Sequence, residues 1–221
     1  MRTIRVTGSG QIKVRPDLTR VTVTLNGLYK EYGETLRRSS EDTEALGDVL
    51  SGLGFGREDL KTLSFGVEPE YETYKDRNGL FKQRFAGYRF RHCMKLEFPS
   101  DNERLGRVLY ALSESRTEPE LRISYTVSDP EGTKNALLGK AVADAKEKAD
   151  VLTRAGGVRL LDIQSIDYSW GELNLECRPM NNAFMARKEL AEPVTADSFK
   201  LDVEPDDIMV SDTVTVVWEI E

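Results

Sequence analysis

His92 has the most obvious chemical potential, because it is the only histidine in the chain and histidine titrates near neutral pH. It lies in an alternating, strand-like stretch whose same-face residues are apolar or aromatic: Tyr88, Phe90, Met94 and Leu96. Catalysis would need a nucleophile or carboxylate beside the imidazole, so we expect a packing histidine whose ring nitrogens bond locally. A single histidine also excludes a multi-histidine metal site.

Three glutamates, Glu68, Glu70 and Glu72, alternate along a predicted strand and therefore project from one face. Carboxylates in a row could bind a hard cation such as calcium. Strand residues two apart are separated by about 6.6 Å, which is too far for one ion without help from a loop. We therefore expect a solvated face that pairs with Arg89 and Arg91 on the neighbouring strand.

A second acidic cluster lies near the carboxyl terminus: Asp202, Glu204, Asp206 and Asp207. It lacks the spacing and the downstream glutamate of a calcium loop. A carboxylate-based enzyme would have Glu68, Glu70 or Asp207 as candidates, but such catalysis needs a desolvated pair and we expect these side chains to be exposed. The sequence predicts no catalytic, cofactor-binding or metal-binding residue, and a protein that is not an enzyme.

Glycine and cysteine motifs predict no reactive site either. Gly8-Ser9-Gly10 is followed by a strand-like stretch, whereas a phosphate-binding loop needs a helix amino terminus there, so we predict a bulge or crossing. Cys93 points away from the face of His92, which excludes a Cys–His dyad within the strand. Cys93 and Cys177 form neither a CxxC pair nor a zinc spacing.

The composition is that of a globular chain, with 221 residues, 39% of them hydrophobic, and a formal net charge of -7. This acidity argues against nucleic acid or an anionic membrane as the main partner, although local basic patches are compatible with it. No stretch approaches the roughly 20 consecutive apolar residues of a membrane span. The amino terminus has no apolar signal region, which predicts a cytoplasmic protein, or a periplasmic or extracellular one if the chain has been trimmed.

The stretch 129–157 carries the strongest structural signal. Asp129 can cap a helix, Pro130 fits its first turn, and Gly156 with Gly157 can end it. Between these signals, small and apolar residues recur at spacings of three and four: Leu138, Ala141, Ala145, Ala149, Leu152 and Ala155. Because alanine leaves little side chain between a helix and its neighbour, we expect a helix about 39 Å long lying close against a sheet.

Residues 60–98 are typical of a long β-hairpin. Asn78-Gly79 favours a two-residue turn with positive φ at both positions. The register that follows pairs apolar with apolar residues and opposite charges with each other: Leu63 with Met94, Phe65 with His92, Val67 with Phe90, and Glu68 with Arg89.

Periodicity predicts the remaining elements. We expect strands near 4–6, 12–14, 21–27, 121–127, 161–170 and 208–220, and helices near 36–53 and 105–112. This order predicts an α+β fold, an antiparallel sheet with helices packed on one face and two similar strand–helix–strand–strand halves. We expect a single domain over 1–221 with possible pseudo-halves 1–98 and 99–221. Residues 171–207 do not alternate, and we interpret them as an irregular arm, either a subunit contact or disordered.

Five motifs occur in order along the chain: Val6-x-Gly8-x-Gly10 with Pro16-Asp17, Asp59-Leu60-x-Thr62, Pro69-x-Tyr71, Ala141-x-x-x-Ala145-x-x-Lys148-Ala149, and Pro205-x-x-Ile208-x-Val210-x-x-x-Val214-x-Val216. Together they resemble the SIMPL-domain family of bacterial proteins of unknown function, which includes periplasmic immunogenic and oxidative-stress-defence proteins. The resemblance implies an α+β fold, two similar halves and homo-oligomers. It implies no catalytic residue.

These observations favour a non-enzymatic, self-associating structural or interaction protein. The alternative is a binding module for a small ligand or peptide, related to stress or signalling. A carboxylate-based enzyme is the third hypothesis.

Overall fold

The computed structural model describes residues 2–168, 173–178 and 204–221. They form two compact units, each assembled from separate stretches of chain. The first unit comprises 2–17, 126–168, 173–177 and 205–221, and the second comprises 18–125 with residues 178 and 204. Each unit is built on a sheet with helical cover on one face, which confirms the predicted α+β class. The contiguous halves 1–98 and 99–221 stay a prediction about internal duplication.

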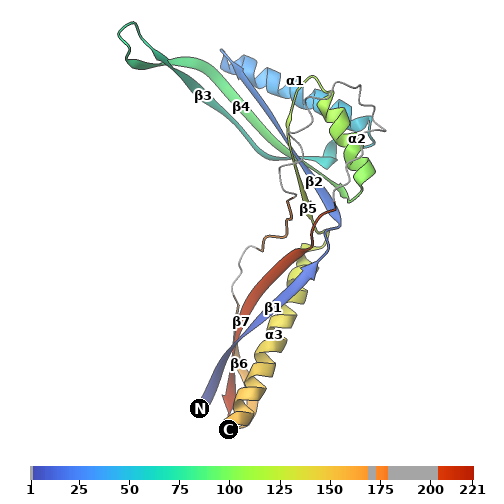
Figure 1. Cartoon of the computed structure of the whole chain (residues 1–221), viewed down its shortest axis with the longest axis vertical. Helices are drawn as coiled ribbons and strands as arrows, with labels where there is room; N and C mark the ends of the chain where they lie inside the picture. Colours follow the sequence, from blue (N-terminus) through green and yellow to red (C-terminus); the bar gives the residue numbers. More distant parts are fainter. Residues whose placement is uncertain (1, 169–172, 179–203) are drawn as a thin grey trace. The chain divides into compact units, whose positions relative to one another are not determined.

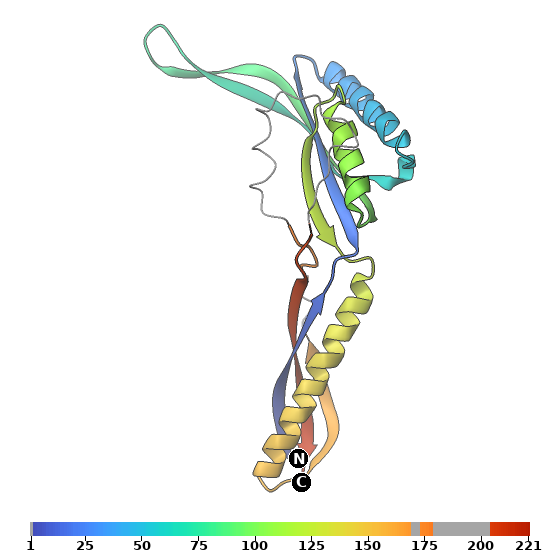
Figure 2. The ribbon, with the colours of Figure 1, turned by 45° about the vertical axis from the view of Figure 1, so that its right-hand side comes forward.

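The first unit is a three-stranded antiparallel sheet with one long helix (Figure 1). The strand order is β1 (Arg2–Val14), β7 (Ile208–Ile220), β6 (Leu160–Tyr168). β1 and β7 pair without a break along their whole length. The helix α3 (Pro130–Ala155) runs alongside these strands (Figure 2).

The helix α3 begins and ends as its sequence predicts. The Asp129 carboxylate accepts a hydrogen bond from the backbone N–H of Gly132 at 2.7 Å, and Gly156 follows the last helical residue. Its buried residues are spaced by four: Leu137, Ala141, Ala145, Ala149 and Thr153. The three alanines were predicted, whereas Leu152 and Ala155 are exposed and Leu138 is only partly buried. Residues four apart form a ridge along a helix, and that ridge packs against β1 and β7.

Gly8 and Gly10 allow this ridge to approach the backbone of β1. A Cβ atom on Gly8 would lie 2.1 Å from the carbonyl oxygen of Ala141, and one on Gly10 would lie 2.4 Å from that of Leu137. The predicted bulge or crossing at Gly8-Ser9-Gly10 is wrong, because β1 is one continuous strand through these residues. The glycines are needed for the close approach of the helix.

The second unit is a four-stranded sheet whose order is β3–β4–β2–β5. Along the chain, its elements are β2 (Leu18–Tyr29), α1 (Tyr32–Ser51), the 3-10 helix η1 (Arg57–Asp59), β3 (Leu60–Lys75), β4 (Phe81–Pro99), α2 (Asn102–Ser113) and β5 (Glu120–Thr126). The helices α1 and α2 share one core with the sheet, which buries Leu46, Leu112 and Phe90.

The β3–β4 hairpin does not have the predicted two-residue turn. Asp76 N–H donates to the carbonyl of Leu80, so a three-residue loop joins the strands. Gly79 has a φ of 79°, whereas Asn78 is not in the left-handed region. This loop is a type I turn followed by a left-handed glycine, the usual form of a three-residue hairpin.

The centre of the hairpin nevertheless has the predicted register. A shift between Glu70 and Tyr71 compensates for the different loop, so three predicted pairs are confirmed: Phe65 with His92, Val67 with Phe90, and Glu68 with Arg89. The fourth is wrong, because a second shift displaces Leu63 and Met94 pairs with Thr62. The two irregularities are β-bulges, which a period-two pattern does not reveal.

We predict that Gly8→Ala lowers the free energy of unfolding by about 1–3 kcal/mol or more, because the added methyl group must push α3 away from β1. Urea denaturation followed by circular dichroism measures the change. Gly139→Ala in α3 is the matched control, since no atom lies within 4 Å of where its Cβ would stand, and it should stabilise the protein by about 1 kcal/mol. A Gly8→Ala protein as stable as the parent would contradict this packing.

Candidate functional site

His92 is held between α1 and β3 by hydrogen bonds to both ring nitrogens. Nδ1 lies 3.0 Å from the hydroxyl of Thr43, and Nε2 lies 2.9 Å from that of Thr62. Thr43 donates its proton to the carbonyl of Ser39, so it accepts from Nδ1–H, which assigns the tautomer and leaves Nε2 to accept from Thr62. The ring of Phe65 packs against the imidazole edge to face. Both ring nitrogens are therefore used in local hydrogen bonds that hold the imidazole in place. Burial lowers the pKa of His92.

The glutamate row does not converge on a common point. Glu70 accepts hydrogen bonds from two nitrogens of Arg89, and this pairing lowers the pKa of its carboxyl. Glu72 forms a separate ion pair with Arg84 at 2.6 Å. Glu70 and Glu72 thus each have a cation of their own on β4, and of the two expected arginines only Arg89 pairs with the row.

In the second acidic cluster, Asp206 and Asp207 both interact with Lys13. Asp207 lies 2.9 Å from Lys13, whose pKa it raises through a side-chain hydrogen bond. Asp202 lies outside the described residues. Arg91, which was expected to pair with the glutamate row, lies 3.9 Å from Glu120 instead. Within 2–168, 173–178 and 204–221, no group of three or more histidine, cysteine or acidic residues could hold a metal ion.

The predicted arm lies mostly outside the described residues, as does the end of the strand predicted near 161–170. Its interpretation as a subunit contact stays a prediction. One described part of it, Leu175, is buried in the first unit, and its carbonyl accepts a hydrogen bond from the Thr126 hydroxyl at 2.9 Å.

The surface that sequence reasoning missed is on β6. Ile163 pairs with Trp218 of β7, and Ile166 pairs with Val216, so these isoleucines face the side of the sheet where α3 lies. Trp218 and Val216 are 3% and 0% exposed beneath the helix, whereas Ile163 and Ile166 are 50% and 46% exposed. The helix therefore covers β1 and β7 but leaves Ile163 and Ile166 exposed. These two side chains form the apolar face of β6.

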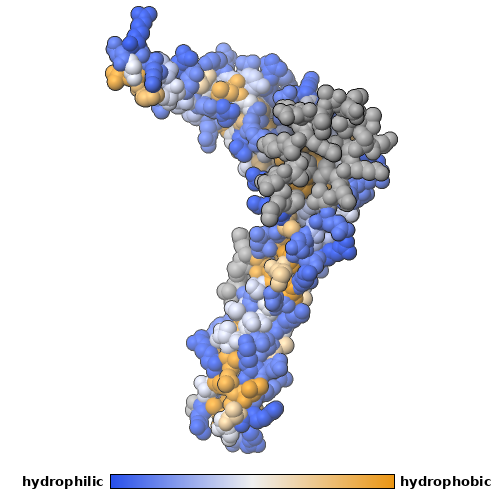
Figure 3. Space-filling model, in the orientation of Figure 1, coloured by the Kyte–Doolittle hydropathy of each residue, from blue (hydrophilic) through white to orange (hydrophobic). Residues whose placement is uncertain are grey.

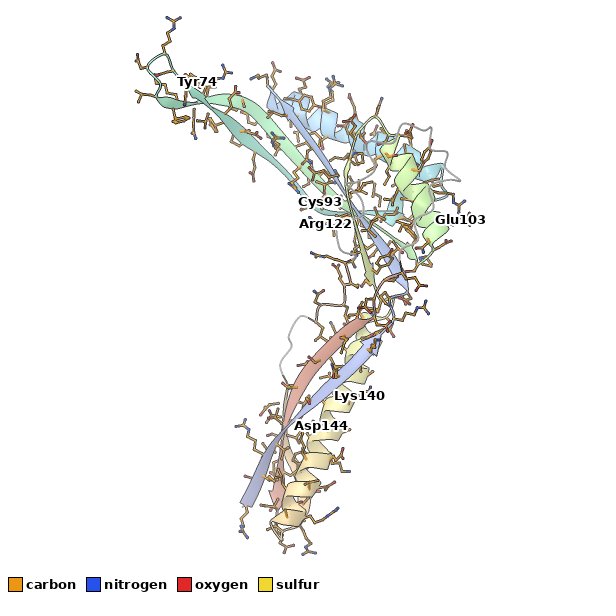
Figure 4. All side chains as sticks on the ribbon, in the orientation of Figure 1. Tyr74, Cys93, Glu103, Arg122, Lys140 and Asp144 are labelled. Atoms are coloured by element: carbon orange, nitrogen blue, oxygen red, sulfur yellow. The ribbon has the colours of Figure 1, made fainter. Side chains whose placement is uncertain are left out.

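The opposite edge of the same sheet is closed by α3. Asp144 accepts a hydrogen bond from the backbone N–H of Ser9 at 2.7 Å, and Lys140 donates to the carbonyl of Gln11 at 3.4 Å (Figure 4). Lys148 donates to Asp144 at 2.7 Å and lowers the pKa of its carboxyl. These side chains occupy backbone groups that an additional strand would need. β1 is thus protected at the edge, while the β6 edge carries exposed isoleucines.

The face of this sheet away from α3 is largely polar. The hydroxyls of Thr7 and Thr215 lie 2.9 Å apart, and Arg5 pairs with Asp167 at 3.6 Å. An antiparallel sheet commonly has one packed and one solvated face, so these residues need no cover. The apolar face of β6 is different, because it lies on the packed side of the sheet but is not covered by α3.

The described residues thus define an α+β protein whose distinctive surface is an uncovered strand rather than a reactive cluster. Residues 4–218 match the SIMPL family, described as a protein of unknown function (DUF541). The chain belongs to this family, as the resemblance of its motifs implies.

Two relatives are the 26 kDa periplasmic immunogenic proteins of Brucella melitensis biotype 1 and Brucella abortus strain S19. Each is 24% identical to this chain over 157 residues, a match that covers 71% of this chain and only 62% of the relative. Both are described as periplasmic, which does not support the predicted cytoplasmic location and agrees with the periplasmic alternative. None of the described helices is both long and apolar enough to cross a bilayer.

Similarity to solved structures is low. CutA from Synechococcus elongatus PCC7942 has a TM-score of 0.23 and 14% identity, over 59% of this chain and 95% of that one. A hydrolase from Listeria innocua has a TM-score of 0.22 and 11% identity, over 96% of this chain and 92% of that one. Scores this low support no argument about fold or function.

We predict that the free energy of unfolding falls as the pH drops below about 6.5, the usual pKa of histidine. Burial lowers the pKa of His92 in the folded state, so the unfolded chain binds the proton more readily. The loss should begin near the unfolded pKa and level off once the pH passes the lower folded pKa. Urea denaturation across this range, compared with His92→Gln, measures it; a pH dependence that persists unchanged in the variant would exclude His92 as its source.

Proposed function

We propose that this chain is a non-enzymatic structural or interaction protein that associates with copies of itself through the apolar face of β6. The observation that carries the proposal is the change in exposure between adjacent strands. Val216 is fully buried, and its neighbour Ile166 on the same side of the sheet is 46% exposed. Fully burying one such side chain stabilises an assembly by about 1.5–3 kcal/mol.

A second copy of the chain is a suitable partner for this face. A two-fold contact places the same surface on both subunits, so each pair of isoleucines would meet the other pair. The partly buried Leu138 and Val142 of α3 belong to the core beside it and extend the apolar area. β6 has register shifts on both sides of Ile163, which favours packing of side chains over continuous strand addition.

The candidate acids support a role without catalysis. Glu70 and Asp207 each have a cationic partner, Arg89 and Lys13. Carboxylate catalysis needs a desolvated group with a pKa matched to its task. Pairing with a cation holds each carboxylate in place, which suits a structural ion pair.

We also propose a periplasmic location, because the names of both Brucella relatives describe them as periplasmic. Expression of the complete natural gene product followed by cell fractionation tests this. Recovery with the cytoplasmic fraction would contradict it.

We predict that Ile163→Lys combined with Ile166→Lys converts the assembly to monomers, because two lysines on the apolar face would be buried without partners. Size-exclusion chromatography with light scattering at micromolar concentration measures the mass. Ala143→Lys is the control, since Ala143 is exposed and lies on the side of α3 away from Ala141 and Ala145.

The control should keep the mass of the parent protein. Circular dichroism should show that both variants fold, because substitutions at exposed positions usually cost little stability. A monomeric parent protein, or a double variant with the parent's mass, would refute self-association through β6.

A further inference from the structure

The outer end of the β3–β4 hairpin presents two adjacent apolar side chains to solvent. Leu80 is 62% exposed and Phe81 is 71% exposed. Figure 1 shows the hairpin extending past α1, and Figure 3 shows hydrophobic residues at its end bordered by hydrophilic ones. Side chains of this kind at the end of a projecting ribbon contribute nothing to the core of their own unit.

The turn that carries them is internally braced. The Asp76 carboxylate accepts hydrogen bonds from the backbone N–H groups of Asn78 at 2.8 Å and Leu80 at 3.1 Å. It also pairs with Lys82 at 2.8 Å, and these contacts lower the pKa of the Asp76 carboxyl. Leu80 is therefore held in position before any partner arrives, which reduces the entropy cost of binding.

The end of the hairpin is basic although the chain is acidic. Residues 72–84 contain four cations and two carboxylates, a local charge of +2 against -7 for the whole chain: Lys75, Arg77, Lys82 and Arg84 against Glu72 and Asp76. Adjacent strand positions project to opposite faces. The Lys75 ammonium lies over the Phe81 ring, and the Arg84 guanidinium lies over the Tyr74 ring on the other face. Positive charge thus surrounds the apolar end.

We propose that this end of the hairpin docks on the surface of an anionic lipid bilayer. Leu80 and Phe81 enter the boundary between headgroups and acyl chains, and Lys75 and Arg77 face the lipid phosphates. Apolar side chains bordered by cations suit this boundary, where each cation near the surface contributes about 1 kcal/mol. Tyr74 lies further along the hairpin (Figure 4), at the level where aromatic rings meet headgroups.

A protein partner fits this surface less well. A stable protein interface buries about 800 Å² on each side, which a narrow two-stranded end does not offer. The net acidity of the chain opposes general attraction to anionic lipids, so contact would be confined to the basic end. This inference is separate from self-association, which concerns β6 in the other unit.

Vesicle co-sedimentation of the full chain tests the proposal. The probes are vesicles of phosphatidylcholine alone and vesicles with about 30% phosphatidylglycerol. We expect binding to the anionic vesicles and a loss of about tenfold or more with Leu80→Ser combined with Phe81→Ser. Lys75→Gln combined with Arg77→Gln removes two cations and should cost roughly 30-fold. Leu63→Ser, an exposed apolar position elsewhere in the hairpin, should bind like the parent.

Three results would overturn the proposal. The parent protein could fail to sediment with anionic vesicles, or the Leu80→Ser, Phe81→Ser variant could bind them as well as the parent. The third is a Leu80→Ser, Phe81→Ser variant with a lower mass in solution than a parent protein that does not bind vesicles. That result would make the hairpin end a contact between copies of the chain. Unchanged mass together with lost vesicle binding supports lipid docking and leaves self-association through β6 unaffected.

Discussion

A helix with its side chains is about 10 Å wide, and neighbouring strands lie about 4.8 Å apart, so one helix covers roughly two strands. The three-stranded unit has one helix, α3, and its position is set by contact between the alanine ridge and Gly8 and Gly10 of β1. That contact draws the helix toward β1 and β7. β6 is left with apolar residues on the packed side of the sheet and no helix above them, and the proposed self-association follows from this geometry.

The sheets of the two units are covered by different helices, and each leaves an edge strand partly exposed, since Leu63 and Phe65 of β3 are 53% and 49% exposed. In the four-stranded unit, α1 and α2 share a continuous core with the sheet, and residues such as Leu46, Phe90 and Leu112 are fully buried there. Its unusual feature is the hairpin end, where a braced turn presents Leu80 and Phe81. One unit therefore lacks cover for a strand, and the other carries apolar residues beyond its core, so the two proposed surfaces have different physical origins.

Local signals predicted much of this structure. The Asp129 cap, the glycine end of α3 and the alternation of β7 depend on neighbours in sequence, and the structure confirms them. The predicted turn at Asn78-Gly79 was wrong because the register shift between Glu70 and Tyr71 changes the count of residues between the turn and the centre of the hairpin. Which strands share a sheet, and which strand lies beyond the reach of α3, depend on contacts between distant segments. Periodicity does not contain that information, so the β6 surface could not be predicted from it.

Hydrogen exchange measured by mass spectrometry over a dilution series tests the central claim most directly. If the apolar face of β6 is covered by a second copy, peptides from residues 160–168 should become more protected as the protein concentration rises. Peptides from β1 should not change, because α3 already closes that edge. Exchange in 160–168 that is identical at all concentrations, in a protein that is otherwise folded, would contradict the account.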